Sequence, residues 1–271
     1  MKKLLFISFA LATTLFVNAQ KNTLLEQSFW KKAPDVATVH AEIAKGNSPS
    51  QSNDKSFDPV VLAINNEAPN ETILFLLKQP GNEVSKSTHD NRIYLHWASY
   101  KGNLEIVNYL ISKGSNINLE DSKGATPIDF AASSGVNNLE IYDAFFKAGI
   151  DPKKKYQDGS NLLLLGISSD KYLTLTNYFI SKGMSLKDVD SNGNTAINYA
   201  ARSGNIPLIK TLLSKGVKYN DNAIIIAAQG SRRDSNPIEV YQYLIEELNI
   251  KPTAVNTDGE TALHILAAKP K

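Results

Sequence analysis

The residues of this 271-residue chain that are best suited to chemistry are its carboxylates and its four histidines. The segment Asp188–Gly193 reads D-V-D-S-N-G, which matches the opening of a calcium-binding loop of the EF-hand type. Such a loop needs a bidentate glutamate at its twelfth position, where this chain has Tyr199. The segment therefore predicts a turn in the backbone and not a calcium site.

The histidines do not form a metal site either. His40, His89, His96 and His264 lack the spacing of a metal-binding pair such as H-E-x-x-H. The chain has no cysteine, which excludes disulfides and thiolate chemistry. It contains no nucleophile elbow, phosphate loop or dinucleotide fingerprint. We therefore expect a non-enzymatic protein without catalytic residues, cofactor or metal.

A periodic pattern of glycines organises almost the whole chain. One glycine recurs at intervals of 33 to 35 residues, at Gly46, Gly81, Gly114, Gly149, Gly183 and Gly216. Asn249 follows 33 residues later, and asparagine is the usual substitute for glycine in a left-handed backbone conformation. Because each marker follows an apolar segment, we expect a helix that ends at a left-handed cap in every unit.

A second series keeps the same phase, at Gly124, Gly159, Gly193 and Gly259. Each of these glycines begins a turn, and a helix is expected to follow it. Thr126, Thr195 and Thr261 stand at the expected helix starts, where a threonine hydroxyl can accept a free backbone N–H. Pro127 suits the first helical position because its missing donor costs nothing there. Each unit is thus predicted to be a turn and two helices.

The unit resembles the ankyrin repeat. Residues 121–135 read D-S-K-G-A-T-P-I-D-F-A-A-S-S-G, close to the family pattern D-x-x-G-x-T-P-L-H-x-A-A-x-x-G. The resemblance implies an all-α solenoid of stacked helix–turn–helix units with hairpin-like loops, in which stacking builds one continuous core. It also places His96 and His264 where the family's histidine bonds to backbone between repeats.

The array is divided as follows. Residues 20–51 are a degenerate first repeat or N-terminal cap, and residues 52–271 hold roughly six full repeats and a partial last unit. Gly166 stands where alanine is usual, which predicts a less regular helix there. The last unit stops after one helix, so Leu263 and Leu266 are expected to lack a covering helix unless the array continues or something else covers it.

The resemblance also implies a binding surface for a protein partner, on the concave face and the hairpin tips. Within that surface, Tyr100 and Arg202 are the strongest candidates because each combines a large contact area with a polar group. The inner aromatic residues Trp97, Phe130, Tyr199 and Tyr241 are assigned to the core between repeats. The predicted partner-binding positions are His89, Asp90, Arg92, Tyr100, Lys101, Ser122, Lys123, Ala125, Ser133, Ser134, Ser160, Ser191, Asn194, Arg202 and Ser203.

The first nineteen residues predict a signal peptide. Lys2 and Lys3 precede an apolar run over residues 4–17, and Val17-Asn18-Ala19 fits a cleavage site that leaves Gln20 first. A retained membrane anchor is the alternative, but the run is shorter than the roughly 20 residues that a spanning helix needs. We expect an exported protein of bacterial type, periplasmic or secreted, with no integral membrane segment after cleavage.

Charge argues against a nucleic-acid partner. Removing Lys2 and Lys3 from 29 basic residues leaves 27, equal to the 27 acidic residues. Nucleic-acid binding needs a concentrated basic face. The sequence therefore predicts a monomeric protein-interaction scaffold in the cell envelope. Two alternatives stay open: a spacer or protective role there, or the binding or spacer region of a longer protein whose activity lies beyond residue 271.

Overall fold

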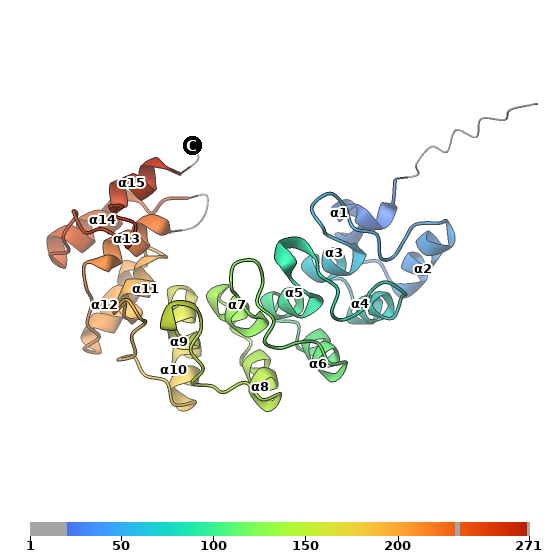
Figure 1. Cartoon of the computed structure of the whole chain (residues 1–271), viewed down its shortest axis with the longest axis horizontal. Helices are drawn as coiled ribbons and strands as arrows, with labels where there is room; N and C mark the ends of the chain where they lie inside the picture. Colours follow the sequence, from blue (N-terminus) through green and yellow to red (C-terminus); the bar gives the residue numbers. More distant parts are fainter. Residues whose placement is uncertain (1–20, 231–233, 270–271) are drawn as a thin grey trace, which may run out of the picture.

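The computed structural model describes residues 21–230 and 234–269, which form a crescent of stacked helix pairs (Figure 1). The predicted signal peptide lies outside the described residues. Throughout the described part of the chain the elements are helical, with one isolated β-bridge between Val255 and Thr261. The expected all-α solenoid is confirmed.

One layer of the crescent consists of the first helix of each pair. Consecutive members of this inner layer contact one another along the array, for example α5 with α7, α11 with α13, and α13 with α15. The inner helices are α1 (Gln27–Trp30), α3 (Pro59–Asn65), α5 (Tyr94–Tyr100), α7 (Pro127–Ser133), α9 (Leu162–Gly166), α11 (Ala196–Ala201), α13 (Asn222–Gln229) and α15 (Ala262–Ala267).

The second helices of the pairs form the outer layer. These are α2 (Val36–Ala44), α4 (Asn70–Leu77), α6 (Leu104–Ser112), α8 (Leu139–Lys147), α10 (Thr174–Ser181), α12 (Ile206–Ser214) and α14 (Ile238–Gln242), the last continuing as a π-helical turn over Tyr243–Glu247. Short 3-10 turns lie at Thr23–Leu25, His89–Asn91, Gln157–Gly159 and Ile167–Ser169. The predicted left-handed caps are confirmed: φ is +81° at Gly114 and +51° at Asn249.

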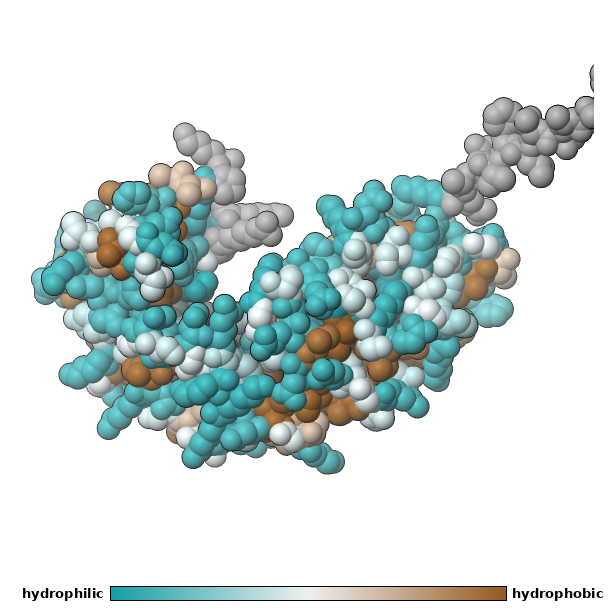
Figure 2. All heavy atoms as spheres, in the orientation of Figure 1, coloured by the Kyte–Doolittle hydropathy of each residue, from teal (hydrophilic) through white to brown (hydrophobic). Residues whose placement is uncertain are grey.

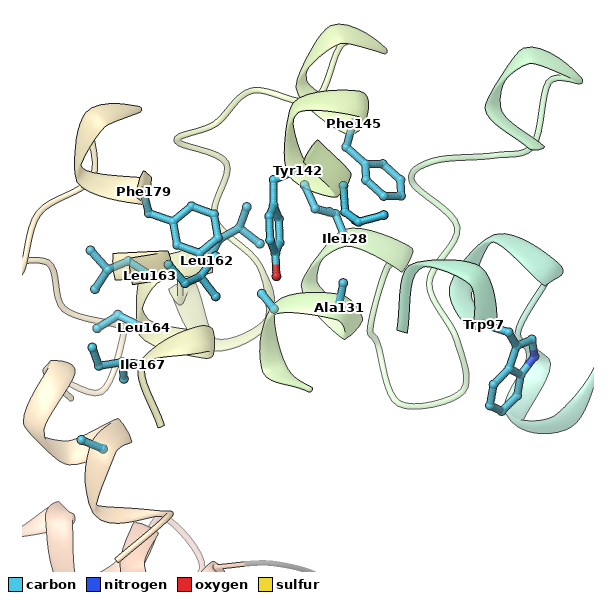
Figure 3. Close-up of a cluster of buried hydrophobic side chains, with 14 of the residues drawn as sticks. Trp97, Ile128, Ala131, Tyr142, Phe145, Leu162, Leu163, Leu164, Ile167 and Phe179 are labelled. Carbon is cyan, nitrogen blue, oxygen red and sulfur yellow. The ribbon is translucent and has the colours of Figure 1, made fainter. Parts of the chain in front are cut away.

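The core is continuous from pair to pair because small residues let the inner helices approach. Ala131 and Ala200 are fully buried in α7 and α11. Between the layers, larger side chains fill the space (Figure 3). The rings of Tyr142 and Phe179 meet edge to face, with centroids 5.0 Å apart. The Tyr142 hydroxyl donates to the carbonyl of Val136 at 2.6 Å, so its polar end is satisfied.

The helix at Gly166 is less regular than most of its counterparts, as predicted. Helix α9 spans Leu162–Gly166 and passes into a 3-10 turn. A Cβ at Gly166 would lie 2.9 Å from a methyl carbon of Leu175, closer than real contacts allow. A methyl group at this position would therefore require the end of the Leu175 side chain on α10 to shift.

The helix starts follow one scheme. The side chain three residues into the helix accepts a hydrogen bond from the backbone N–H of the N-cap residue: Asp129 accepts from Thr126 at 2.6 Å and Asn198 accepts from Thr195 at 3.3 Å. The threonine hydroxyls donate to the same two side chains. The predicted N-cap positions are confirmed, and at both starts the threonine and the third helical residue form a capping box.

His96 joins two repeats as the family pattern implies. Its Nε2 lies 3.1 Å from the carbonyl of Ala125, and its Nδ1 accepts from the N–H of Ile93 at 3.3 Å. Burial lowers the pKa of His96, which keeps the ring neutral and suited to both bonds. The resemblance implies the same role for His264, but its side chain is exposed, and the bonds that its ring makes among the described residues are to Thr261 of its own unit. The inter-repeat bond fails there because no described unit follows α15.

The C-terminal end of the described stack is apolar and open. Leu263 on α15 is 75% exposed and Ile238 on α14 is 64% exposed. Together with Tyr241 and Leu266 they line a hollow of about 480 Å³. Leu263 thus lacks a covering helix, as the sequence predicted, whereas Leu266 is half-buried.

A buried polar cluster holds the first full repeats together. The Asp58 carboxylate is fully buried; it caps α3 through the N–H of Val61 at 2.9 Å and pairs with Lys86 at 2.7 Å. The Tyr94 hydroxyl donates to the same carboxylate at 2.6 Å. Tyr94 occupies the place where the family pattern has proline, and this bond across repeats explains its presence.

Substitution of Tyr94 by phenylalanine should therefore destabilise the protein. Removing a donor from a buried carboxylate is expected to cost about 1.5–3 kcal/mol of unfolding free energy. Urea unfolding followed by circular dichroism measures the change, with Tyr172→Phe as the control because Tyr172 is 79% exposed. Equal stability of the two variants would contradict the role given to Tyr94.

The raised pKa of Asp129 predicts that the stability of the protein depends on pH. Burial raises its pKa from 3.8 to about 6, against the opposing effect of the Thr126 hydrogen bonds. The folded state then holds this proton more tightly than the unfolded chain, so stability should fall as pH rises from about 4 to about 6. The loss is at most roughly 3 kcal/mol.

Asp129→Asn should remove that loss, because Asn198 already makes the equivalent bonds to Thr195. We expect the variant to be more stable than the unchanged protein at pH 8 and similar to it at pH 4. Urea midpoints measured across this range test the expectation. Asp54→Asn, at an exposed carboxylate, is the control, and a parallel pH profile for all three proteins would refute the assignment.

Candidate functional site on the concave face

Hairpin tips form a row along the inner side of the crescent, and backbone hydrogen bonds connect some of the neighbouring tips. Ser122 N–H donates to the carbonyl of Asp90 at 2.8 Å, and Ser191 N–H donates to that of Asp158 at 2.7 Å. These bonds span one repeat and hold the tips at fixed separation. The row therefore presents a rigid edge beside the inner helices.

Aspartates at the base of the hairpins shape each tip. Asp121 accepts the N–H of Lys123 at 2.8 Å and that of Ala125 at 3.0 Å, and it pairs with Arg92 at 2.6 Å. Burial alone would raise the pKa of Asp121, but the backbone donors and the guanidinium bring it below its ordinary value. Asp121 therefore remains ionised and ties two repeats together.

Three predicted partner-binding residues are buried, and their role in binding stays a prediction. Arg92 is enclosed by the rings of Phe130 and Trp97, 4.2 Å and 5.1 Å from its guanidinium carbon. Ser160 donates to the carbonyl of Gln157, and Asn194 donates to Asp190. Their polar groups are used within and between hairpins, although Asn194 and Ser160 also line the hollows of the concave face.

The other predicted residues reach the surface, and their role in binding stays a prediction. Tyr100 is 41% exposed and stacks on Phe130 at 5.2 Å. Lys101 pairs with Glu67 at 2.5 Å. The exposed members are Tyr100, Ser122, Lys123, Ser133, Ser134, Ser191, Arg202 and Ser203, and the half-buried members are His89, Asp90, Lys101 and Ala125.

Two adjoining hollows lie in the C-terminal half of the concave face. The larger has a volume of about 590 Å³ and the smaller about 290 Å³. Asp158, Tyr199 and Arg202 line both, so the hollows form one groove. In Figure 2, hydrophilic residues dominate the inward edge of the crescent between its C-terminal end and its middle.

Arg202 occupies the centre of this groove. Its guanidinium donates to the side-chain oxygen of Gln229 at 3.3 Å, and among the described residues it forms no salt bridge. Surrounding protein lowers the pKa of Arg202, although water still reaches the side chain. A guanidinium has five N–H donors, so most of them are available to a ligand.

Several groove residues were not predicted from the sequence. Asp158, Asn222, Gln229 and Asp258 line the groove beside the predicted Arg202. Gln229 stands at the end of α13 in the position equivalent to that of Arg202 at the end of α11. It could therefore have been predicted by aligning the two repeats. The others could not be found in this way because the groove depends on how separate repeats are spaced.

The segment that resembled a calcium loop is a hairpin of this groove. Asp190 accepts from the N–H groups of Asn192 and Asn194, from the Asn194 side chain and from the Tyr199 hydroxyl. Both carboxylate oxygens are therefore engaged by protein donors. Over residues 21–230 and 234–269, no group of three or more His, Asp or Glu side chains is arranged to hold a metal ion.

No helix in the described part of the chain has the length and apolar character needed to cross a bilayer.

The chain is similar to several proteins from eukaryotes. It is 36% identical over 123 residues to the palmitoyltransferase AKR1 of Lachancea kluyveri, covering 44% of this chain and 16% of that protein. It is 30% identical over 146 residues to the probable 26S proteasome regulatory subunit p28 of Saccharomyces cerevisiae, covering 52% and 63%. The chain thus spans less than two thirds of either relative.

The family model for ankyrin repeats, in three copies, matches residues 60–156 and 137–223. These matches cover more than half of the chain and coincide with helix pairs from α3 to α12. The chain therefore belongs to the ankyrin-repeat family.

Proposed function

We propose that this protein is a non-enzymatic scaffold that binds a partner protein in the groove of its concave face. The observation that carries the proposal is the groove itself, which is centred on Arg202 and bounded by rigid hairpin tips. Arg202 combines a large contact area with unused donors, and Tyr100 offers an exposed ring supported by Phe130. Side chains of this kind dominate the energy of protein interfaces.

A photo-crosslinking experiment tests which face binds. The photoreactive residue p-benzoylphenylalanine is placed at Ser133, on the concave side, or at Asn108, on the outer helix α6; both positions are exposed. Irradiation in cells of the source organism should give a discrete adduct from the Ser133 protein only. Adducts from Asn108 alone, or from neither position, would count against the proposed surface.

Once the partner is identified from the adduct, the contribution of individual residues to its binding affinity can be measured. Tyr100→Ala and Arg202→Ala should each weaken binding of the captured partner by about 1–2 kcal/mol. Circular dichroism should show an unchanged fold, because both side chains are exposed. Unchanged affinity in both variants would remove these two positions from the interface.

We further propose that the protein is an exported monomer of bacterial type that acts in the cell envelope. The sequence of residues 1–19 supports this proposal. The relatives described above give it no support, because they are eukaryotic. In a bacterial host, the tagged chain should appear in the periplasmic fraction with Gln20 as its first residue, and deletion of residues 2–19 should leave it in the cytoplasm. Equal distribution of both forms would refute export by this segment.

A second function is favoured by the open C-terminal end and by the partial match to longer relatives. Leu263 is 75% exposed, and the chain matches 16% of the length of the Lachancea palmitoyltransferase. The array would then be the binding or spacer region of a longer protein whose activity lies beyond residue 271. Sequencing the complete transcript from the source organism distinguishes this function from that of an independent scaffold.

A further inference from the structure

The larger hollow lies where one repeat lacks its hairpin. The units around α11 and α15 have hairpins, at Asp190–Asn194 and at Asn256–Glu260, in which a side chain accepts two backbone N–H groups. The unit of α13, which lies between them, begins instead with Asn220 and Asp221 directly before the helix. The hollow of about 590 Å³ lies at this gap in the row, with residues of both hairpins in its wall.

Among the described residues, backbone groups on both sides of the gap lack the bond that joins the tips at Asp90 and Ser122 and those at Asp158 and Ser191, as the tips at Lys123 and Gln157 also do. In the row, Ser191 N–H donates to the carbonyl of Asp158 in the previous tip. In the hairpin before the gap, the carbonyl that corresponds to that of Asp158 belongs to Asn192. In the hairpin after the gap, the N–H that corresponds to that of Ser191 belongs to Thr257. Among the described residues, neither group makes a backbone hydrogen bond, although both residues line the hollow.

The remaining lining of the hollow suits a polypeptide main chain. Gln229 accepts from Arg202 through its oxygen, which leaves its amide N–H groups for a ligand. Asn222 donates to Asn194, which leaves its side-chain oxygen as an acceptor. Together with the unused donors of Arg202, these groups supply the donors and acceptors that peptide groups need. An extended segment inserted beside a row of backbone groups is an established mode of recognition.

The charge of the groove favours basic side chains on that segment. Asp158 and Asp258 are exposed in its wall, and among the described residues neither forms a salt bridge. Asp190 and Asp129 also line the groove, whereas Arg202 is the one cation among its lining residues. A lysine or arginine of the segment would therefore meet complementary charge at either end of the larger hollow.

Given the proposed function, on which this step rests, we propose that the partner inserts an extended, basic segment of its chain into the gap left by the missing hairpin. The segment's main chain bonds Asn192 and Thr257 in place of the absent tip. Its lysine or arginine side chains pair with Asp158 and Asp258.

Fluorescence anisotropy with labelled peptides tests the inference. The probe is the peptide Lys-Ser-Lys-Val-Lys-Ser-Lys, compared with the same peptide carrying glutamate for lysine and with one methylated at alternate main-chain nitrogens. We expect the lysine peptide to bind at least tenfold more tightly than the other two. Equal or tighter binding of the glutamate peptide would overturn the charge assignment, and equal binding of the methylated peptide would overturn main-chain recognition.

Matched protein variants locate the binding. The double variant Asp158→Asn with Asp258→Asn should weaken binding of the lysine peptide at least tenfold. The control, Glu140→Gln with Glu239→Gln, removes the same charge from exposed positions on the outer helices α8 and α14 and should bind like the unchanged protein. Equal loss in both double variants would mean a general charge effect and would refute insertion into the gap.

The outcome is separable from that of the proposed function. If the Ser133 protein captures a partner whose affinity is the same for the aspartate double variant and its control, the scaffold function stands and the inserted basic segment is refuted. If no adduct forms on the concave side and the peptides do not bind, both are refuted.

Discussion

The fold depends on one constraint: no helix pair in this chain can bury its own apolar face. Removing apolar surface from water is the main favourable term in folding, and a two-helix unit has too few neighbours to do so alone. The next pair supplies the cover, and fully buried alanines such as Ala131 and Ala200 let the inner layers approach. At α15, where no described pair follows, Leu263 remains 75% exposed. The contrast shows that stacking, and not the single unit, provides the core.

Stacking also determines where the polar groups go. Asp58, Asp121 and His96 are buried, and each bonds to a residue of a neighbouring repeat. A buried polar group without a partner would be costly, so these bonds must be complete for the stack to form. They also fix the register between units, because each bond connects specific residues about one repeat apart. The rigid concave edge is a consequence of this internal pairing.

The sequence predicts those features that are set within one unit. The left-handed caps at Gly114 and Asn249, the N-cap threonines and the less regular helix at Gly166 all follow from local backbone chemistry. The burial of Arg92 could not be predicted in this way, since it depends on Phe130 and Asp121 of the next repeat. Likewise, Asp158 and Asp258 are about 100 residues apart in sequence and share a groove only because intervening repeats stack with a regular curvature.

The gap in the hairpin row is compatible with a stable stack because one asparagine replaces the contacts that the hairpin would make. Asn220 donates to the carbonyl of Gly193 at 2.8 Å and accepts from Asn198 at 2.6 Å. Helices α11 and α13 therefore remain in contact, although the unit of α13 has no hairpin of its own. In a repeat array each unit contacts mainly its neighbours, so a local departure of this kind changes the surface without disturbing the core elsewhere. The departure leaves a polar hollow beside Arg202, and specificity in this chain is best sought where one unit differs from the others.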